Sequence, residues 1–86
     1  MDEKIVGEIL EDVYDELYEA TLKNGSFPTA HHGYGVIQEE VDELWDEIKK
    51  KVSKRDTANM RKECIQIAAM AVRFIMDLLP DSETLH

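Results

Sequence analysis

The chain is short of cysteine, proline, glycine and aromatic residues, and each shortage narrows the possible folds. It has one cysteine, Cys64, so no disulfide can form within the chain. Two prolines, four glycines and 7% aromatic residues favour helices over a β-sandwich, which needs frequent turns. The longest apolar stretch, residues 67–74, is interrupted by Arg73 and is too short to span a bilayer. We therefore expect an all-helical protein that does not cross a membrane.

Basic residues are also in the minority, with ten Lys and Arg against nineteen Asp and Glu and a net charge of −9. An acidic surface repels nucleic acid backbones and anionic membranes, so neither is an expected partner. A phosphate compound would need a local basic patch or a bridging cation. Met1 is followed by Asp2 and Glu3, unlike the basic start of a signal peptide, and the expected location is the cytoplasm.

A chain of 86 residues fits one domain with a marginal core. We expect this domain to cover residues 1–80 and the tail 81–86 to be frayed. Apolar residues recur with the 3.6-residue period of amphipathic helices in three segments. The expected helices are Glu3–Lys23, Tyr34–Val52 and Ala58–Leu79.

The connections carry recognisable stop and start residues. Asn24-Gly25 should end the first helix. Residues 26–33 lack a period and contain Pro28, which predicts a loop up to Gly33. The three lysines from Lys49 fall in the last turns of the second expected helix, where cations suit the helix dipole. Asp56 or Thr57 can cap the third helix.

The third expected helix is apolar around nearly its whole circumference, so it must be enclosed on several sides. Two amphipathic neighbours can hardly do this, whereas a second copy of the chain could, and the small residues Ala68, Ala69 and Ala71 would allow close approach. The predicted fold is therefore an all-α bundle of three main helices, completed by dimerisation or a higher homo-oligomer. Trp45 and Cys64 are expected in the core.

Carboxylates gather on one side of the second expected helix. Glu40, Glu43 and Glu47 are spaced i, i+3, i+7, and Glu39 lies one step around. Like charges at this spacing repel each other, and a hard cation such as Mg²⁺ reverses the sign of that interaction. The alternative is a solvated acidic face, which is common on exposed helices.

A polar stripe also runs down the otherwise apolar third helix. Its members lie at i, i+3, i+7, i+10 and i+14: Glu63, Gln66, Met70, Arg73 and Asp77. Burying such groups is costly unless they are paired or bind something. If the second and third helices pack antiparallel, Glu63 and Gln66 face the carboxylates of the second helix. The alternative is a structural network, such as Arg73 paired with a carboxylate.

Two motifs together resemble a known family. Glu39-Glu40-Val41-Asp42-Glu43 is followed, after 19 residues, by Glu63-Cys64-Ile65-Gln66. This arrangement resembles the EExxE and ExxD motifs of the MazG-like all-α nucleoside triphosphate pyrophosphohydrolases, and the likeness extends from about His32 to Leu79. The resemblance implies a helical bundle, commonly dimeric. It also implies Mg²⁺-dependent cleavage of a nucleoside triphosphate between the α- and β-phosphates, giving a nucleoside monophosphate and pyrophosphate.

The resemblance carries over residue by residue. Glu40, Glu43 and Glu63 match metal ligands of the family, and Glu39 matches the leading acid of its motif and is a candidate catalytic base. Gln66 stands where the family has an aspartate. An amide oxygen can coordinate Mg²⁺ without contributing charge, so the fourth ligand position should bind more weakly, and the activity could be altered or lost.

The substrate contacts come from basic and aromatic residues. Seven of the ten basic residues lie between Lys49 and Lys62, and Lys50, Lys54 and Arg61 are candidates to receive phosphates, although charge balance at helix ends explains them equally well. Arg73 is the strongest single candidate. His32 could contact the substrate by stacking on a base, as could three other aromatic residues: Phe27, Tyr34 and Trp45. The pair His31-His32 suggests a transition metal only if further histidines lie nearby.

The sequence thus predicts a Mg²⁺-dependent nucleoside triphosphate pyrophosphohydrolase that acts as a homodimer in the cytoplasm. The rival is a non-catalytic helical dimer that binds a nucleotide or protein partner with the same surface.

Overall fold

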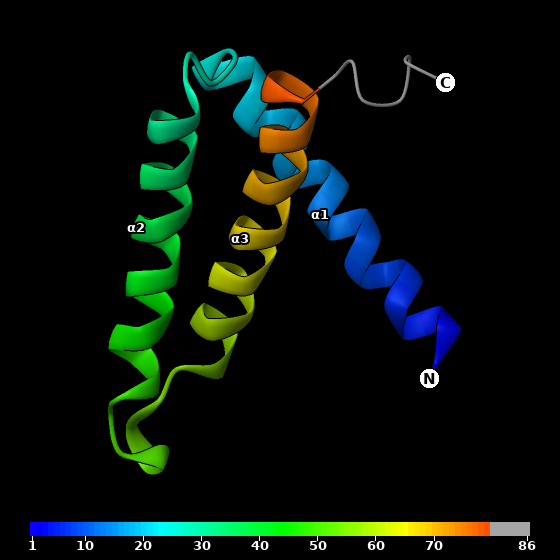
Figure 1. The fold of residues 1–86 in the computed structure, drawn as a ribbon. Helices are drawn as coiled ribbons and strands as arrows, with labels where there is room; N and C mark the ends of the chain where they lie inside the picture. Colours follow the sequence, from blue (N-terminus) through cyan, green and yellow to red (C-terminus); the bar gives the residue numbers. More distant parts are fainter. Residues whose placement is uncertain (80–86) are drawn as a thin grey trace.

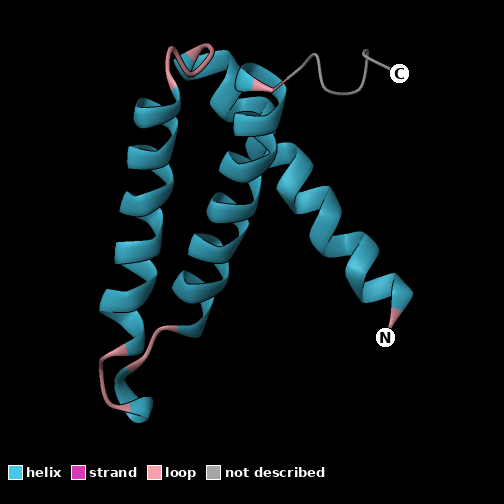
Figure 2. Ribbon diagram, in the orientation of Figure 1, coloured by secondary structure: helices cyan, strands magenta, loops and turns pink. Residues whose placement is uncertain are grey.

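The computed structural model describes residues 1–79, which form three α-helices and one short 3₁₀ helix (Figures 1 and 2). Their bounds are α1 Glu3–Asn24, α2 Ala30–Ile48, η1 Val52–Lys54 and α3 Thr57–Leu78. These residues contain no strand, which confirms the predicted all-α class. None of the three α-helices in this part of the chain is long and apolar enough to cross a membrane. The tail for which fraying is predicted lies outside the described residues.

Helix α1 begins and ends close to the predicted positions. The carboxylate of Asp2 caps its start by accepting hydrogen bonds from the backbone N–H groups of Lys4 and Ile5, at 3.0 and 3.2 Å. Gly25 ends it with a positive φ of 66°, and its N–H donates to the carbonyl of Thr21. The Asn24-Gly25 stop signal is confirmed.

Helix α2 begins four residues earlier than predicted, so the expected loop up to Gly33 is wrong. Thr29 caps the helix, because its Oγ1 accepts a hydrogen bond from the N–H of His32 at 3.1 Å. Gly33 is buried inside the helix, and a Cβ added there would lie 2.8 Å from Cδ2 of Phe74. The glycine therefore serves the close approach of α2 to α3 rather than a turn.

Helix α2 also ends earlier than predicted, at Ile48 instead of Val52. The side chain of Arg55 donates to the carbonyl of Ile48 through Nε at 2.9 Å, which satisfies the end of the helix. The buried carboxylate of Glu47 accepts from the N–H of Asp56 at 2.6 Å and from Nζ of Lys50 at 2.9 Å. These contacts close the α2–α3 turn, and the predicted cap Asp56 is confirmed at the start of α3.

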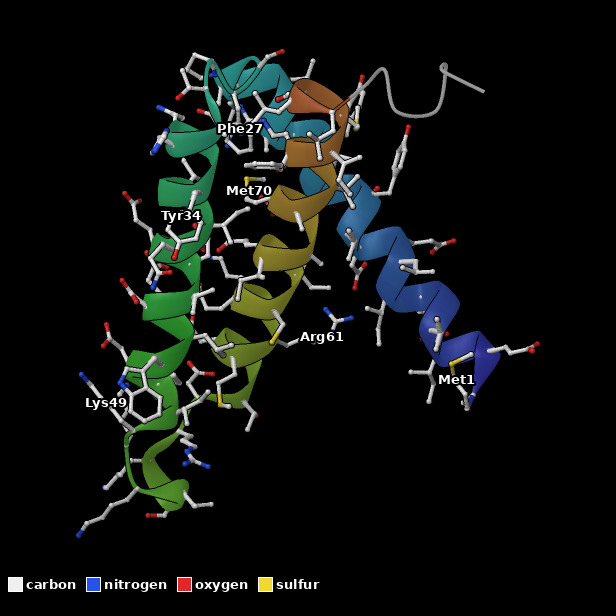
Figure 3. All side chains as sticks on the ribbon, viewed as in Figure 1. Met1, Phe27, Tyr34, Lys49, Arg61 and Met70 are labelled. Atoms are coloured by element: carbon white, nitrogen blue, oxygen red, sulfur yellow. The ribbon has the colours of Figure 1, made fainter. Side chains whose placement is uncertain are left out.

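Helices α2 and α3 form an antiparallel hairpin, and α1 packs against α3 while its N-terminal half leans away from the hairpin (Figure 1). Phe27 and Met70 lie close together where the α1–α2 connection meets α3 (Figure 3). The core is small. Its buried apolar members are Val13, Ala20, Phe27, Ile65, Ala69 and Met70.

One flank of the hairpin is uncovered by any helix in the described part of the chain. On α2 this flank contains Tyr34, Val41 and Trp45, and on α3 it contains Cys64 in line with Ile75. Trp45 is 56% exposed and Cys64 is exposed, so the prediction that both lie in the core is wrong for the single chain. The reason is that α1 packs on the other side of α3.

Candidate metal centre

Three carboxylates meet between the two helices of the hairpin. Glu40 and Glu43 come from α2 and Glu63 comes from α3, and one oxygen of each lies within 4.8 Å of the others. The antiparallel packing produces this meeting, because it brings the first turns of α3 against the second half of α2. Glu47, which shares the same side of α2, stays out of the cluster because it closes the α2–α3 turn.

Burial and mutual repulsion make the ionised form of the cluster unfavourable. Burial raises the pKa of Glu40, and the neighbouring charge of Glu43 raises it further. The hydrogen bond with Glu63 raises the pKa of Glu43, and the charge of Glu63 adds to that effect. Three ionised carboxylates are therefore unfavourable here, and the site favours binding a proton or a cation.

Glu63 distinguishes this cluster from an ordinary acidic surface. Its side chain is only 3% exposed, and its Oε2 has no hydrogen-bond partner among residues 1–79. The half-buried Glu40 also has an Oε2 without a partner there. A buried carboxylate needs a compensating group. Oxygen ligands of this kind fit a hard divalent cation such as Mg²⁺.

A cavity of about 720 Å³ opens beside the cluster, between α1, the α1–α2 connection, α2 and α3. Four of the predicted site residues line it: His32, Glu40, Gln66 and Arg73. Gln66 follows Glu63 by one turn of α3 and turns toward the cavity that it lines. His32 is exposed, with its ring 6.1 Å from the ring of Phe27.

Arg73 is buried, with 4% of the residue exposed, and its Nε has no hydrogen-bond partner among residues 1–79. Its guanidinium donates to the carbonyl of Gly25 and lies 4.1 Å from the centre of the Phe27 ring. Its Nε is 3.6 Å from Oδ2 of Asp77, which in turn accepts from the N–H of Phe27 at 2.8 Å. This is the structural network that the sequence left open as an alternative. A phosphate contact by Arg73 stays a prediction.

The remaining basic candidates lie apart from the cluster and the cavity. Lys50 pairs with Glu47, Lys54 is exposed on η1, and Arg61 pairs with Asp12 of α1 at 2.7 Å. Lys50 is two turns beyond Glu43, about 10 Å along the helix direction. The predicted base Glu39 is exposed beside Glu40 on α2. Neither Lys50 nor Lys54 nor Arg61 lines the cavity.

Glu16 was not predicted as a site residue from the sequence, and Lys62 was predicted only as one of the seven basic residues from Lys49 to Lys62. Glu16 of α1 lines the cavity, and its charge adds to the larger effects of burial and Glu43 on the pKa of Glu40. A signal existed, since Glu16 falls between the buried Val13 and Ala20 on the packed side of α1. Glu63 raises the pKa of Glu43, and the charge of Lys62 lowers it by a smaller amount. Lys62 is thus a basic residue whose charge acts on the cluster.

No family model, no curated protein and no solved structure matches the chain. The resemblance to the MazG-like pyrophosphohydrolases therefore rests on the two motifs, and the three glutamates that it names as ligands are the three that meet in space.

Proposed function

We propose that the protein is a Mg²⁺-dependent nucleoside triphosphate pyrophosphohydrolase that holds its metal with Glu40, Glu43 and Glu63. The observation that supports this most is the buried carboxylate of Glu63, which faces two further carboxylates and has one oxygen without a partner among residues 1–79. The two-motif resemblance supports the reaction type.

The net charge of the chain favours a bridging cation for such a substrate, because the basic candidates Lys50, Lys54 and Arg61 lie apart from the cluster. A triphosphate and a protein with a net charge of −9 repel each other, so the phosphates need neutralisation at the site. Mg²⁺ held by these carboxylates would supply that neutralisation and polarise the phosphoryl group under attack. Glu39, exposed beside the cluster, is the residue that would accept the proton of the attacking water.

Two further parts of the proposal concern the fourth ligand position, at Gln66, and the assembly of the chain through its uncovered flank. An amide at the fourth ligand position adds no charge, so the site relies on three carboxylates. A second copy of the chain would cover the apolar flank that contains Tyr34, Trp45 and Ile75, which gives a homodimer. A cytoplasmic location remains a prediction.

The test is a screen of the common ribonucleoside and deoxyribonucleoside triphosphates for pyrophosphate release by the purified chain with Mg²⁺. The wild type should release pyrophosphate from at least one of them, and Glu43→Gln should reduce the rate. Asp42→Asn is the matched control, because it neutralises the neighbouring exposed acid outside the cluster. Its rate should stay near the wild-type value.

Thermal melting, read together with pyrophosphate release, separates this function from the non-catalytic rival. Gln66 favours the rival, because an amide stands where the family has a charged ligand. Mg²⁺ should raise the melting temperature of the wild type and of Asp42→Asn, and raise that of Glu43→Gln less. Stabilisation by Mg²⁺ with nucleotide but without pyrophosphate release would favour the rival. An equal Mg²⁺ response in all three proteins would assign the glutamates to a solvated face.

A further inference from the structure

The cavity beside the carboxylates has the size of a small-molecule site. Its volume of about 720 Å³ lies within the common range of roughly 300–1,000 Å³ for such sites. Glu40 belongs to both the carboxylate cluster and the cavity wall, so the two are continuous. The buried side chains of Phe27 and Met70 give the cavity an apolar side. A ligand with its anionic end at the cluster would therefore extend its organic end into this space.

Hydrogen-bond acceptors dominate the charged groups of the cavity. Glu16 and Glu19 of α1 line it together with Glu40, and ionised carboxylates only accept hydrogen bonds. The cavity also has two cations: Arg73, which donates to Gly25 and lies beside Phe27 and Asp77, and Lys23, which is exposed at the rim, as Glu19 is. The charge of Arg73 is already opposed by Asp77, so three carboxylates face one unopposed cation. The cavity is thus a poor place for a second anionic group and a good one for N–H donors.

The acceptors on α1 follow one another from the side of the carboxylate cluster toward the α1–α2 connection. Glu16 of α1 lines the same cavity as Glu40, the member of the carboxylate cluster that borders it. Glu19 lies one turn further along α1, which runs on to the connection at Gly25. Acceptors therefore follow a path leading away from the carboxylate cluster, where a nucleoside attached to a bound phosphate tail would lie.

We propose that this cavity binds the nucleobase of the substrate and selects bases that carry an exocyclic amino group, through acceptance of its N–H by Glu19 and Glu16. The inference rests on the proposed function and adds the substrate class to it. A base with a carbonyl oxygen at the same position would place two acceptors against each other. Sites built around one substrate N–H or O–H reject analogues lacking that group strongly.

Matched substrate pairs test the selection, because CTP and UTP, like ATP and ITP, differ by an amino group replaced with an oxygen. The kcat/KM for the amino member should be about tenfold higher or more in both pairs, as expected for a hydrogen bond to a charged group. Glu19→Gln should bring both ratios close to one, because an amide can also donate to the oxygen. Glu11→Gln, exposed on α1 and outside the cavity, should leave both ratios unchanged.

Binding of unphosphorylated nucleosides separates this inference from the proposed reaction. Cytidine at millimolar concentration should shift the amide NMR signals of cavity residues such as Gln66 and Met70, and uridine should not. Pyrophosphate release with equal rates within each pair would overturn the base selection and leave the proposed function standing. No release from any triphosphate, with selective cytidine shifts, would overturn the function and support the cavity. Absence of both release and shifts would overturn both.

Discussion

The network around Arg73 gives the sharpest prediction on stability. Arg73→Met keeps the length of the side chain and removes the charge, which leaves the carboxylate of Asp77 without its cation and the carbonyl of Gly25 without its donor. Breaking a buried ion pair from one side typically costs about 3–5 kcal/mol. A chain of this size has a free energy of unfolding of roughly 4–13 kcal/mol, so the loss should be a large part of the total.

Urea denaturation of wild type and variants measures this loss, and the chain offers a matched control. Arg61 pairs with Asp12 at 2.7 Å, but the two side chains are 54% and 46% exposed, so Arg61→Met should cost no more than about 1 kcal/mol. Arg73→Lys, which keeps the charge and loses the planar fork, should fall between wild type and Arg73→Met. A cost for Arg73→Met no larger than that for Arg61→Met would refute the reasoning.

Further predictions concern packing, pH, the fourth ligand and assembly. Gly33→Ala should destabilise by about 1–3 kcal/mol in urea, because its Cβ would overlap Phe74. The pKa values of Glu40 and Glu43 are raised, so the metal-free folded state binds protons more tightly than the unfolded chain. The melting temperature should therefore fall as the pH rises from 4.5 towards neutrality, and Mg²⁺ should lessen this fall. Gln66→Asp should lower the Mg²⁺ concentration needed for hydrolysis; a less stable protein with unchanged Mg²⁺ affinity would count against a metal ligand there. Light scattering should show a dimer or larger, and a stable monomer of about 10 kDa at micromolar concentration would contradict it.

The parts of the fold that depend on neighbours in sequence were predictable. The three helices, the stop at Gly25 and the cap at Asp56 follow from the 3.6-residue period and from local hydrogen bonds. The start of α2 was not predictable in the same way. Gly33 looks like a helix breaker, but its role is set by Phe74, which lies 41 positions further along the chain and is brought close only by the fold.

The candidate site also has a part that was predictable from local spacing and a part that was not. The meeting of Glu40, Glu43 and Glu63 follows from helical spacing together with antiparallel packing. The separate role of Glu47 does not, because it depends on the hydrogen bond from Asp56 across the turn. The role of Arg73 likewise depends on how the α1–α2 connection crosses α3, which no periodic pattern encodes.

A comparison of the buried charges explains why a ligand is the better account of Glu63. Among residues 1–79 the buried charged side chains are Glu47, Glu63 and Arg73, at 5%, 3% and 4% exposure. Glu47 accepts two hydrogen bonds. Arg73 donates to the carbonyl of Gly25 and its charge lies beside the carboxylate of Asp77, although its Nε has no hydrogen-bond partner among residues 1–79. Glu63 instead faces two carboxylates, and one of its oxygens has no partner in the described part of the chain. Within this part of the chain, the cluster of Glu40, Glu43 and Glu63 thus lacks a compensating positive charge of the kind that Arg73 finds in reverse at Asp77, and its oxygen ligands would suit the Mg²⁺ proposed above.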